Sequence, residues 1–240
     1  MNQLEQAEQE SPLSARDAGF VRALLGELRG ERSFRRRAKQ ISARFLGAPY
    51  LLNPLVGSAE VPERFVIRFD GFDCVTYIET VLALAHARDV EDFVARLRAI
   101  RYEGAVVEWP KRLHYTTDWA ASQIRNGLLK DMTLGEGTIP QKKTLDFLPG
   151  LPPRMAEYRY FPKQSFAYVS RWLIDTDLVY FLSVRRSLDT NHIGMIVREG
   201  EKVLVRHARH KQGRVVEQNL ADFIRISPSP GFIINRIVAE

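Results

Sequence analysis

Cys74, the only cysteine among 240 residues, stands where a thiol can act as a nucleophile. It follows a turn-forming run at residues 70–73, and an apolar pattern with helical spacing begins there. The N-terminus of a helix presents unpaired backbone N–H groups and the positive end of the helix dipole, which favour a thiolate and lower its pKa. The same N–H groups can stabilise an oxyanion. The alternative is that Cys74 is a small buried apolar residue without chemistry.

A thiol nucleophile needs a general base within hydrogen-bond reach and a third polar group that orients the base. Among the five histidines, His86 lies too far along the same helix, at about 1.5 Å of rise per residue, to reach its first turn. His210 stands in a polar stretch typical of a surface. His192 opens a β-rich run and His207 lies near the end of the next one, so neighbouring strands could bring the two imidazoles together. A purely structural role is the alternative for each.

His114 is the competitor for a chemical role. It precedes a predicted helix whose candidate caps are Thr116, Thr117 and Asp118. It either lines a pocket that contacts substrate or faces solvent from a loop, and the residues alone leave both possibilities open.

The scaffold that must position these residues combines helices and strands. Ser14 and Asp73 are natural N-caps for two of the helices. Glycines and prolines predict a long irregular connection over residues 129–165. Because helices come first and strands later, the pattern indicates an α+β domain with an antiparallel sheet packed on the cysteine helix. The periodicity predicts helices at 15–29, 31–46, 73–88, 90–101 and 115–128, and strands at 178–184, 192–197, 202–207 and 232–238.

Composition narrows the class of protein. A hydrophobic content of 45% is enough for an ordinary globular core. The formal net charge of +6 favours anionic partners such as nucleic acid, membrane surfaces or acidic envelope polymers. The densest basic cluster, residues 35–37 with Lys39, lies on an amphipathic helix without a nucleic-acid motif. A solvated helix face is therefore preferred over a nucleic-acid site.

The single cysteine excludes an internal disulfide and a cysteine-based zinc site. No run approaches the roughly 18 consecutive apolar residues of a membrane span. The polar residues 2–6 are not those of a signal peptide. We therefore expect either a cytoplasmic protein or one whose targeting segment has been removed.

Several ordered motifs resemble those of a known superfamily. Residues 46–50 (Leu-Gly-Ala-Pro-Tyr) and 71–74 (Gly-Phe-Asp-Cys) are similar to NlpC-type papain-like cysteine peptidases and amidases, in which a glycine-proline-tyrosine element precedes an aspartate-cysteine helix start. The runs at 192–197 (His-Ile-Gly-Met-Ile-Val) and 204–208 (Leu-Val-Arg-His-Ala) resemble the two strands that supply the base and the orienting residue there.

A narrower resemblance is to the N-acetylmuramoyl-L-alanine amidase-like branch, formerly a domain of unknown function. Residues 72–85, 100–102 and 112–119 carry it, and the likeness extends over about residues 40–225. It implies an α+β, papain-like NlpC-type fold with the nucleophile helix packed on an antiparallel sheet. It also divides the chain into an N-terminal helical extension at 1–40 and a cysteine amidase domain at 41–240, with a helical and loop insertion around 90–165.

The resemblance assigns the catalytic roles position by position. Cys74 becomes the nucleophile, His192 the general base and His207 the orienting group. Tyr50 matches a tyrosine whose hydroxyl stands near the oxyanion in related enzymes. One departure is visible, because relatives commonly have Gly-Asp before the first strand where this chain has Thr-Asp at residues 176–177.

The same resemblance points to residues that line the substrate cleft. His114, Tyr115, Asp118 and Trp119 match the branch-specific stretch, and Asp73 lies beside the nucleophile. Aromatic groups there can stack on a sugar face while a carboxylate accepts hydrogen bonds. For the tryptophan, a place in the core is the alternative.

The implied activity is hydrolysis of the amide bond between N-acetylmuramic acid, in the anhydro form among others, and L-alanine in peptidoglycan fragments. We expect no metal or cofactor. We also expect that the protein neither binds nucleic acid nor inserts stably into a membrane, and that it is a monomer. The family expectation for location is the periplasm or cell envelope, with the cytoplasm as the alternative. The competing functions are a stem-peptide endopeptidase with the same triad, a catalytically silent binding protein of the same fold, and a nucleic-acid binder suggested by charge alone.

Overall fold

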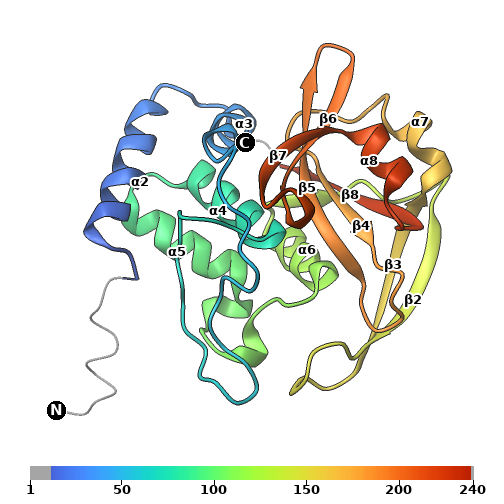
Figure 1. Ribbon diagram of the computed structural model, residues 1–240, viewed down its shortest axis with the longest axis horizontal. Helices are drawn as coiled ribbons and strands as arrows, with labels where there is room; N and C mark the ends of the chain where they lie inside the picture. The colour runs from blue at the N-terminus through green and yellow to red at the C-terminus, as the bar shows by residue number, and fades with distance from the viewer. Residues whose placement is uncertain (1–11, 239–240) are drawn as a thin grey trace.

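The computed structural model describes residues 12–238, so residues 1–11 of the predicted N-terminal extension lie outside it. The helices of the described residues are α2 (Ala15–Glu27), α3 (Phe34–Arg44), α4 (Cys74–His86), α5 (Val90–Arg101), α6 (Thr116–Arg125), α7 (Phe166–Val169) and α8 (Leu220–Ile226). The strands are β1 (Leu129–Asp131), β2 (Ile139–Leu145), β3 (Arg154–Pro162), β4 (Leu178–Leu182), β5 (Thr190–Glu199), β6 (Lys202–Arg209), β7 (Arg214–Asn219) and β8 (Gly231–Ile237). Helices α2 to α5 gather on one side of the molecule and the sheet forms the other (Figure 1). Within residues 12–238, no helix is long and apolar enough to cross a membrane.

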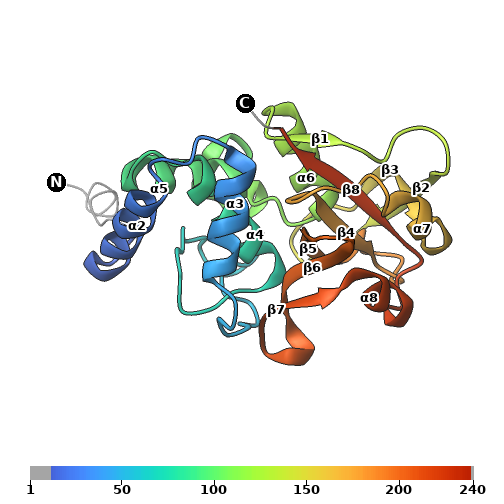
Figure 2. The same cartoon turned by 90° about the horizontal axis from the view of Figure 1, so that it is seen from above.

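The strands form one antiparallel sheet in the order β2-β3-β8-β4-β5-β6-β7, with β1 paired to β8. One face packs on α4, because Tyr180, Ile193 and Met195 share a core with the apolar residues of that helix. The opposite face has its own core, which includes Phe181 of β4 and Phe223 of α8. Figure 2 shows α8 on the far side of the sheet from α4. The predicted α+β fold, with an antiparallel sheet packed on the cysteine helix, is confirmed.

Most predicted elements are confirmed, but one prediction is wrong. Helix α5 has the predicted bounds, and α4 begins directly after its predicted N-cap, Asp73. The supposed irregular connection at 129–165 instead contains β1 and the β2–β3 hairpin. β2 carries few apolar residues and lies at the edge of the sheet, where a strand can include Pro140. Strand β7 and the short helices α7 and α8 were not predicted.

The basic cluster of α3 has a structural use that the sequence did not indicate. Arg37 donates to the backbone oxygen of Ala87 (2.7 Å), where it stabilises the C-terminal end of α4. Lys39 binds Asp175 (2.8 Å), and Arg35 donates to a backbone oxygen of β8. The interpretation of this cluster as a solvated face is therefore wrong for three of its four cations.

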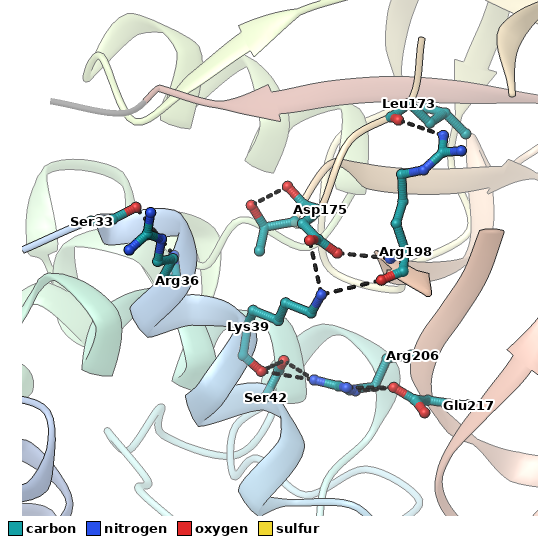
Figure 3. A network of polar contacts seen from close by, with 10 residues as sticks. Ser33, Arg36, Lys39, Ser42, Leu173, Asp175, Arg198, Arg206 and Glu217 are labelled. Carbon is teal, nitrogen blue, oxygen red and sulfur yellow. Dashed lines mark hydrogen bonds and ion pairs between the residues drawn. The ribbon is translucent and has the colours of Figure 1, made fainter. Parts of the chain in front are cut away.

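Arg206 joins α3 to the sheet from the middle of β6. Its Nη1 donates to the Lys39 oxygen (2.9 Å) and the Ser42 hydroxyl (2.5 Å), and its Nε donates to Glu217 (2.8 Å). Figure 3 shows this network between the helix and the two strands. The Arg206 side chain is only 6% exposed, so each of these partners would lose a bond in an apolar setting without it.

The departure from the family pattern at residues 176–177 lies in a tight turn before β4. Thr176 has a φ of 69°, in the left-handed region that favours glycine. Its backbone N–H donates to Ile196 (2.8 Å), and the buried Asp177 pairs with Arg236 (2.8 Å). These bonds hold the same turn that a glycine would adopt without strain.

Replacing Arg206 should destabilise the whole molecule. In Arg206→Gln, Glu217 loses its partner at a site where it is 23% exposed, and we expect the free energy of unfolding in urea to fall by about 3 kcal/mol. The matched control is Arg225→Gln, which breaks an exposed pair with Asp222 and should change that free energy by less than about 0.5 kcal/mol. Equal effects of the two variants would show that the network does not hold α3 on the sheet.

Candidate active site

The start of α4 is fixed by Asp73. Its carboxylate accepts the backbone N–H groups of Val75 (3.0 Å) and Thr76 (2.7 Å), and the Thr76 hydroxyl accepts the N–H of Asp73 (3.0 Å). This capping box satisfies donors that the first turn would otherwise leave free. Cys74 is thereby held as the first helical residue, as predicted. The Asp73 carboxylate is occupied as a cap, and the residue also lines a neighbouring cavity; its contact with substrate stays a prediction.

Tyr50 reaches the site because its segment is paired on both sides. The Tyr50 N–H donates to Gly213 before β7 (2.8 Å), and the Phe72 N–H donates to Pro49 (2.9 Å). A Cβ at Gly71 would lie 2.7 Å from the Pro49 oxygen, so glycine is required for this close approach. The motif at 46–50 and the motif at 71–74 are therefore neighbours in space.

Both the thiol and the phenol hold their protons at neutral pH. Burial, followed by the Asp73 carboxylate, raises the pKa of Cys74 to about 12, although N–H groups that include that of Ile193 act in the opposite direction. Burial also raises the pKa of Tyr50 to about 12, with further contributions from Cys74 and Asp73. The expectation of a lowered thiol pKa is wrong in the free protein, because burial outweighs the helix N-terminus.

His192 and His207 lie together, as the hairpin predicted. Nε2 of His192 is 2.5 Å from Nδ1 of His207, and Nε2 of His207 is 3.0 Å from the Gln218 side-chain oxygen. Because that oxygen can only accept, His207 carries its proton on Nε2, and its Nδ1 accepts from His192. His192 is then protonated on Nε2, which leaves its Nδ1 lone pair as the base. Gly194 makes room, since a Cβ there would lie 3.2 Å from that of His207.

The backbone beside His192 meets the nucleophile. The N–H of Ile193 lies close enough to Cys74 to lower the pKa of its thiol, which places the sulfur near the start of β5. Within residues 12–238, no hydrogen bond to Nδ1 of His192 is formed in this state. Burial is the largest cause that lowers the pKa of His192 well below its usual value and that of His207 to about 4, so both rings are neutral at pH 7. The site thus combines a protonated thiol with a neutral, oriented base.

Of the other three histidines, His86 and His114 lie outside this group, and the exposed His210 has its ring 5.1 Å from that of Tyr50. His86 stacks on Phe34 at 3.6 Å between ring centroids, away from the first turn of α4. Nε2 of His114 donates to the Trp109 backbone oxygen (2.8 Å), and burial is the main cause that lowers the pKa of His114 to about 4.

One cavity adjoins α4, and a second lies beyond it without an α4 residue in its wall; Cys74 itself lines neither of the two. The nucleophile cavity, of about 450 Å³, is bordered by Asp73 and Val75, the two neighbours of Cys74 in the chain. The outer cavity, of about 390 Å³, includes Tyr115 and Asp118 in its wall. Residues 112–114 line both cavities and form the wall between them.

The predicted cleft residues divide between these walls and the core. His114 lines both cavities. Tyr115 is 4% exposed and its hydroxyl accepts the Phe147 N–H (3.0 Å), so little beyond its ring edge is available. Asp118 forms an ion pair with Arg154 at the outer cavity. Trp119 is 1% exposed and packs near Tyr180, so it belongs to the core, and its predicted place in the cleft is corrected.

Two ion pairs near the nucleophile cavity were not predicted from the sequence. Arg101 binds Glu79 (2.7 Å), and both side chains are almost fully buried. Burial raises the pKa of Glu79, and Arg101 opposes that rise. Arg112 binds Glu63 (2.9 Å), which also accepts the Tyr102 hydroxyl (2.8 Å). No local pattern marks these residues, although the charge of Glu79 within an apolar helical run was a signal that could have been followed.

The chain belongs to the AmiA-like, N-acetylmuramoyl-L-alanine amidase-like family, whose model matches residues 40–232. An N-acetylmuramoyl-L-alanine amidase from Bacteroides uniformis has a similar structure, with a TM-score of 0.77, 23% identity, and coverage of 85% of this chain and 99% of the other. A DUF1460 protein from Legionella pneumophila gives a TM-score of 0.82 at 23% identity, covering 93% and 95%. A protein from Bacteroides fragilis proposed to be a xylanase gives 0.71 at 24% identity, covering 82% and 100%. At these identities the neighbours show a shared fold. No protein of curated function matches this sequence.

Acid should destabilise the protein through His207. Its pKa is about 4 when folded and about 6.5 ordinarily, so the unfolded chain binds more protons between these values. The contribution is complete above pH 6.5 and is lost as the pH falls toward 4, by roughly 3 kcal/mol. Denaturant titrations from pH 7 to 4 should show a shallower loss for His207→Gln than for the wild type. A wild-type slope in His207→Gln would contradict the assignment.

Proposed function

We propose that this protein is a papain-like, NlpC-type cysteine amidase that hydrolyses the bond between N-acetylmuramic acid and L-alanine in peptidoglycan fragments. The observation that carries the proposal is the chain of contacts from Cys74 through Ile193 to the pair His192 and His207, ending at Gln218. Membership of the amidase-like family supports the choice of bond. A substrate of this class would place the protein in the periplasm or cell envelope.

The reaction begins with attack of the Cys74 sulfur on the lactyl carbonyl carbon of the muramic acid. Because thiol and imidazole are both neutral beforehand, Nδ1 of His192 takes the thiol proton as the carbon–sulfur bond forms. The oxyanion faces the Cys74 N–H and the protonated hydroxyl of Tyr50. His207 and Gln218 keep the His192 lone pair directed at the reaction.

Two further steps complete the reaction: the tetrahedral intermediate expels the amine, and water then hydrolyses the thioester. The imidazolium of His192 gives its proton to the alanine nitrogen, so that the carbon–nitrogen bond breaks and the peptide leaves with a free amine. The muramoyl group remains on Cys74 as a thioester. Water, deprotonated by His192, attacks that thioester and releases the muramic acid carboxyl group and the thiol. The nucleophile cavity beside Asp73 and Val75 holds substrate during both steps.

Incubation with a mixture of muropeptides tests this reaction directly. Mass spectrometry should detect free stem peptide and peptide-free sugar with the wild type, and neither product with Cys74→Ala or Cys74→Ser. Products cut between peptide residues would establish the endopeptidase instead. Absence of every product under conditions where a control amidase is active, with Cys74 no more reactive toward iodoacetamide than an ordinary thiol, would establish a silent binding protein.

Loss of the Tyr50 hydroxyl should slow the chemical step. We expect Tyr50→Phe to lower kcat by roughly 100-fold with little change in KM, because the hydroxyl acts on the oxyanion and not on the bound ground state. Tyr168→Phe, at a side chain that is 59% exposed, is the matched control and should retain wild-type kinetics. A kcat within about twofold of the wild type in Tyr50→Phe would remove this residue from the mechanism.

A further inference from the structure

The two cavities differ in charge. In the nucleophile cavity, Asp73 and Glu79 stand against Arg101 and Arg112, so cations and carboxylates balance. The outer cavity has four cations against two carboxylates; its charged residues are Glu103, Lys111, Arg112, Asp118, Arg125 and Arg154. His114, which lines both cavities, is neutral at pH 7 because burial lowers its pKa to about 4. Because Glu63 also pairs with Arg112, the outer cavity carries a net excess of one positive charge, that of Lys111, in a concave site.

The excess charge is available to a ligand. Among residues 12–238, no ion pair or side-chain hydrogen bond engages the ammonium group of Lys111, and the side chain is exposed. Arg125 and Glu103 are 3.3 Å apart and about half exposed, so their mutual attraction is weak. Arg154 pairs with Asp118 but remains 37% exposed. A carboxylate entering the cavity can bind these cations without displacing a buried pair.

Arg112 connects the two cavities and is held in place. Its guanidinium lies over the Trp109 ring at 4.5 Å, and its Nη1 binds Glu63 (2.9 Å). Nη2 has no partner within the described residues, and the side chain lines both cavities. A ligand that reaches from Cys74 across the wall at 112–114 therefore meets a positioned cation before it enters the outer cavity.

We propose that the outer cavity binds a carboxylate of the peptide part of the substrate, with Lys111 and Arg154 as its main contacts and Arg112 on the path to it. This inference rests on the proposed function, since it assigns one end of that substrate. The sugar side of the scissile bond is a neutral polyol and gains nothing from excess cations, whereas the stem peptide ends in a carboxylate. The peptide leaving group therefore extends from Cys74 through the nucleophile cavity into the outer one, and the sugar lies on the other side of the sulfur.

Two substrates that differ only in the terminal group of the peptide test this assignment. One is a muramoyl peptide with a free terminal carboxylate, and the other carries a terminal carboxamide. We expect kcat/KM for the acid to exceed that for the amide by about tenfold, the difference lying in KM, because hydrogen bonds to a charged group are worth more than those to a neutral one. In Lys111→Gln/Arg154→Gln the ratio should fall below about twofold, while Arg154→Lys alone should retain most of the preference. Lys202→Gln, in the β5–β6 hairpin away from both cavities, should keep the full ratio.

Binding to Cys74→Ala, measured by calorimetry with the same two peptides, separates this inference from the proposed reaction. Tighter binding of the acid without any cleavage by the wild type would support the carboxylate subsite and overturn the amidase. Cleavage of both substrates with equal kcat/KM and equal affinity would support the amidase and overturn the subsite. A preference for the acid that persists in Lys111→Gln/Arg154→Gln, or failure of either peptide to bind, would also overturn it.

Discussion

The arrangement of Cys74, His192 and Tyr50 depends on the contact between the first turn of α4 and the start of β5. Asp73 fixes that turn by accepting two backbone N–H groups, and the Cys74 sulfur lies against the Ile193 N–H. A shift of one residue on either element would move the sulfur away from His192. The close packing of Gly71 on Pro49 then brings Tyr50 to the same point. The proposed nucleophile, base and oxyanion donor therefore come from three separate parts of the chain that meet at a single helix end.

Polar contacts between the helices and the sheet keep the start of α4 aligned with the start of β5. Arg206 projects from β6, one residue before His207, and binds the backbone and side chain of α3. Arg37, on the same helix, binds the far end of α4. One short helix thus holds both the strand that carries His207 and the helix that carries Cys74. Loss of stability and loss of catalytic geometry are coupled for this reason.

Local sequence patterns predicted the parts of the molecule that local physics determines. Asp73 and the spacing after it predicted the start of α4, and the turn near Gly200 predicted that His192 and His207 would be neighbours. The edge strand β2 was not predicted, because its sequence, rich in polar and charged residues, lacks the alternation of apolar and polar residues that indicates a strand. The sequence left the core position of Trp119 open, and it did not indicate the high pKa of Cys74, the Glu79 pair or the hydrogen bond of Gln218. Each depends on contacts between residues far apart in the sequence.

A competing nucleophile tests the central claim, that Cys74 carries the acyl group of the substrate. Hydroxylamine added during turnover intercepts a thioester but cannot alter a reaction in which water attacks the amide directly. The account predicts that muramoyl hydroxamate replaces free muramic acid as hydroxylamine rises, while the rate of peptide release is unchanged when acylation limits turnover. Free acid as the sole sugar product at every hydroxylamine concentration would contradict it.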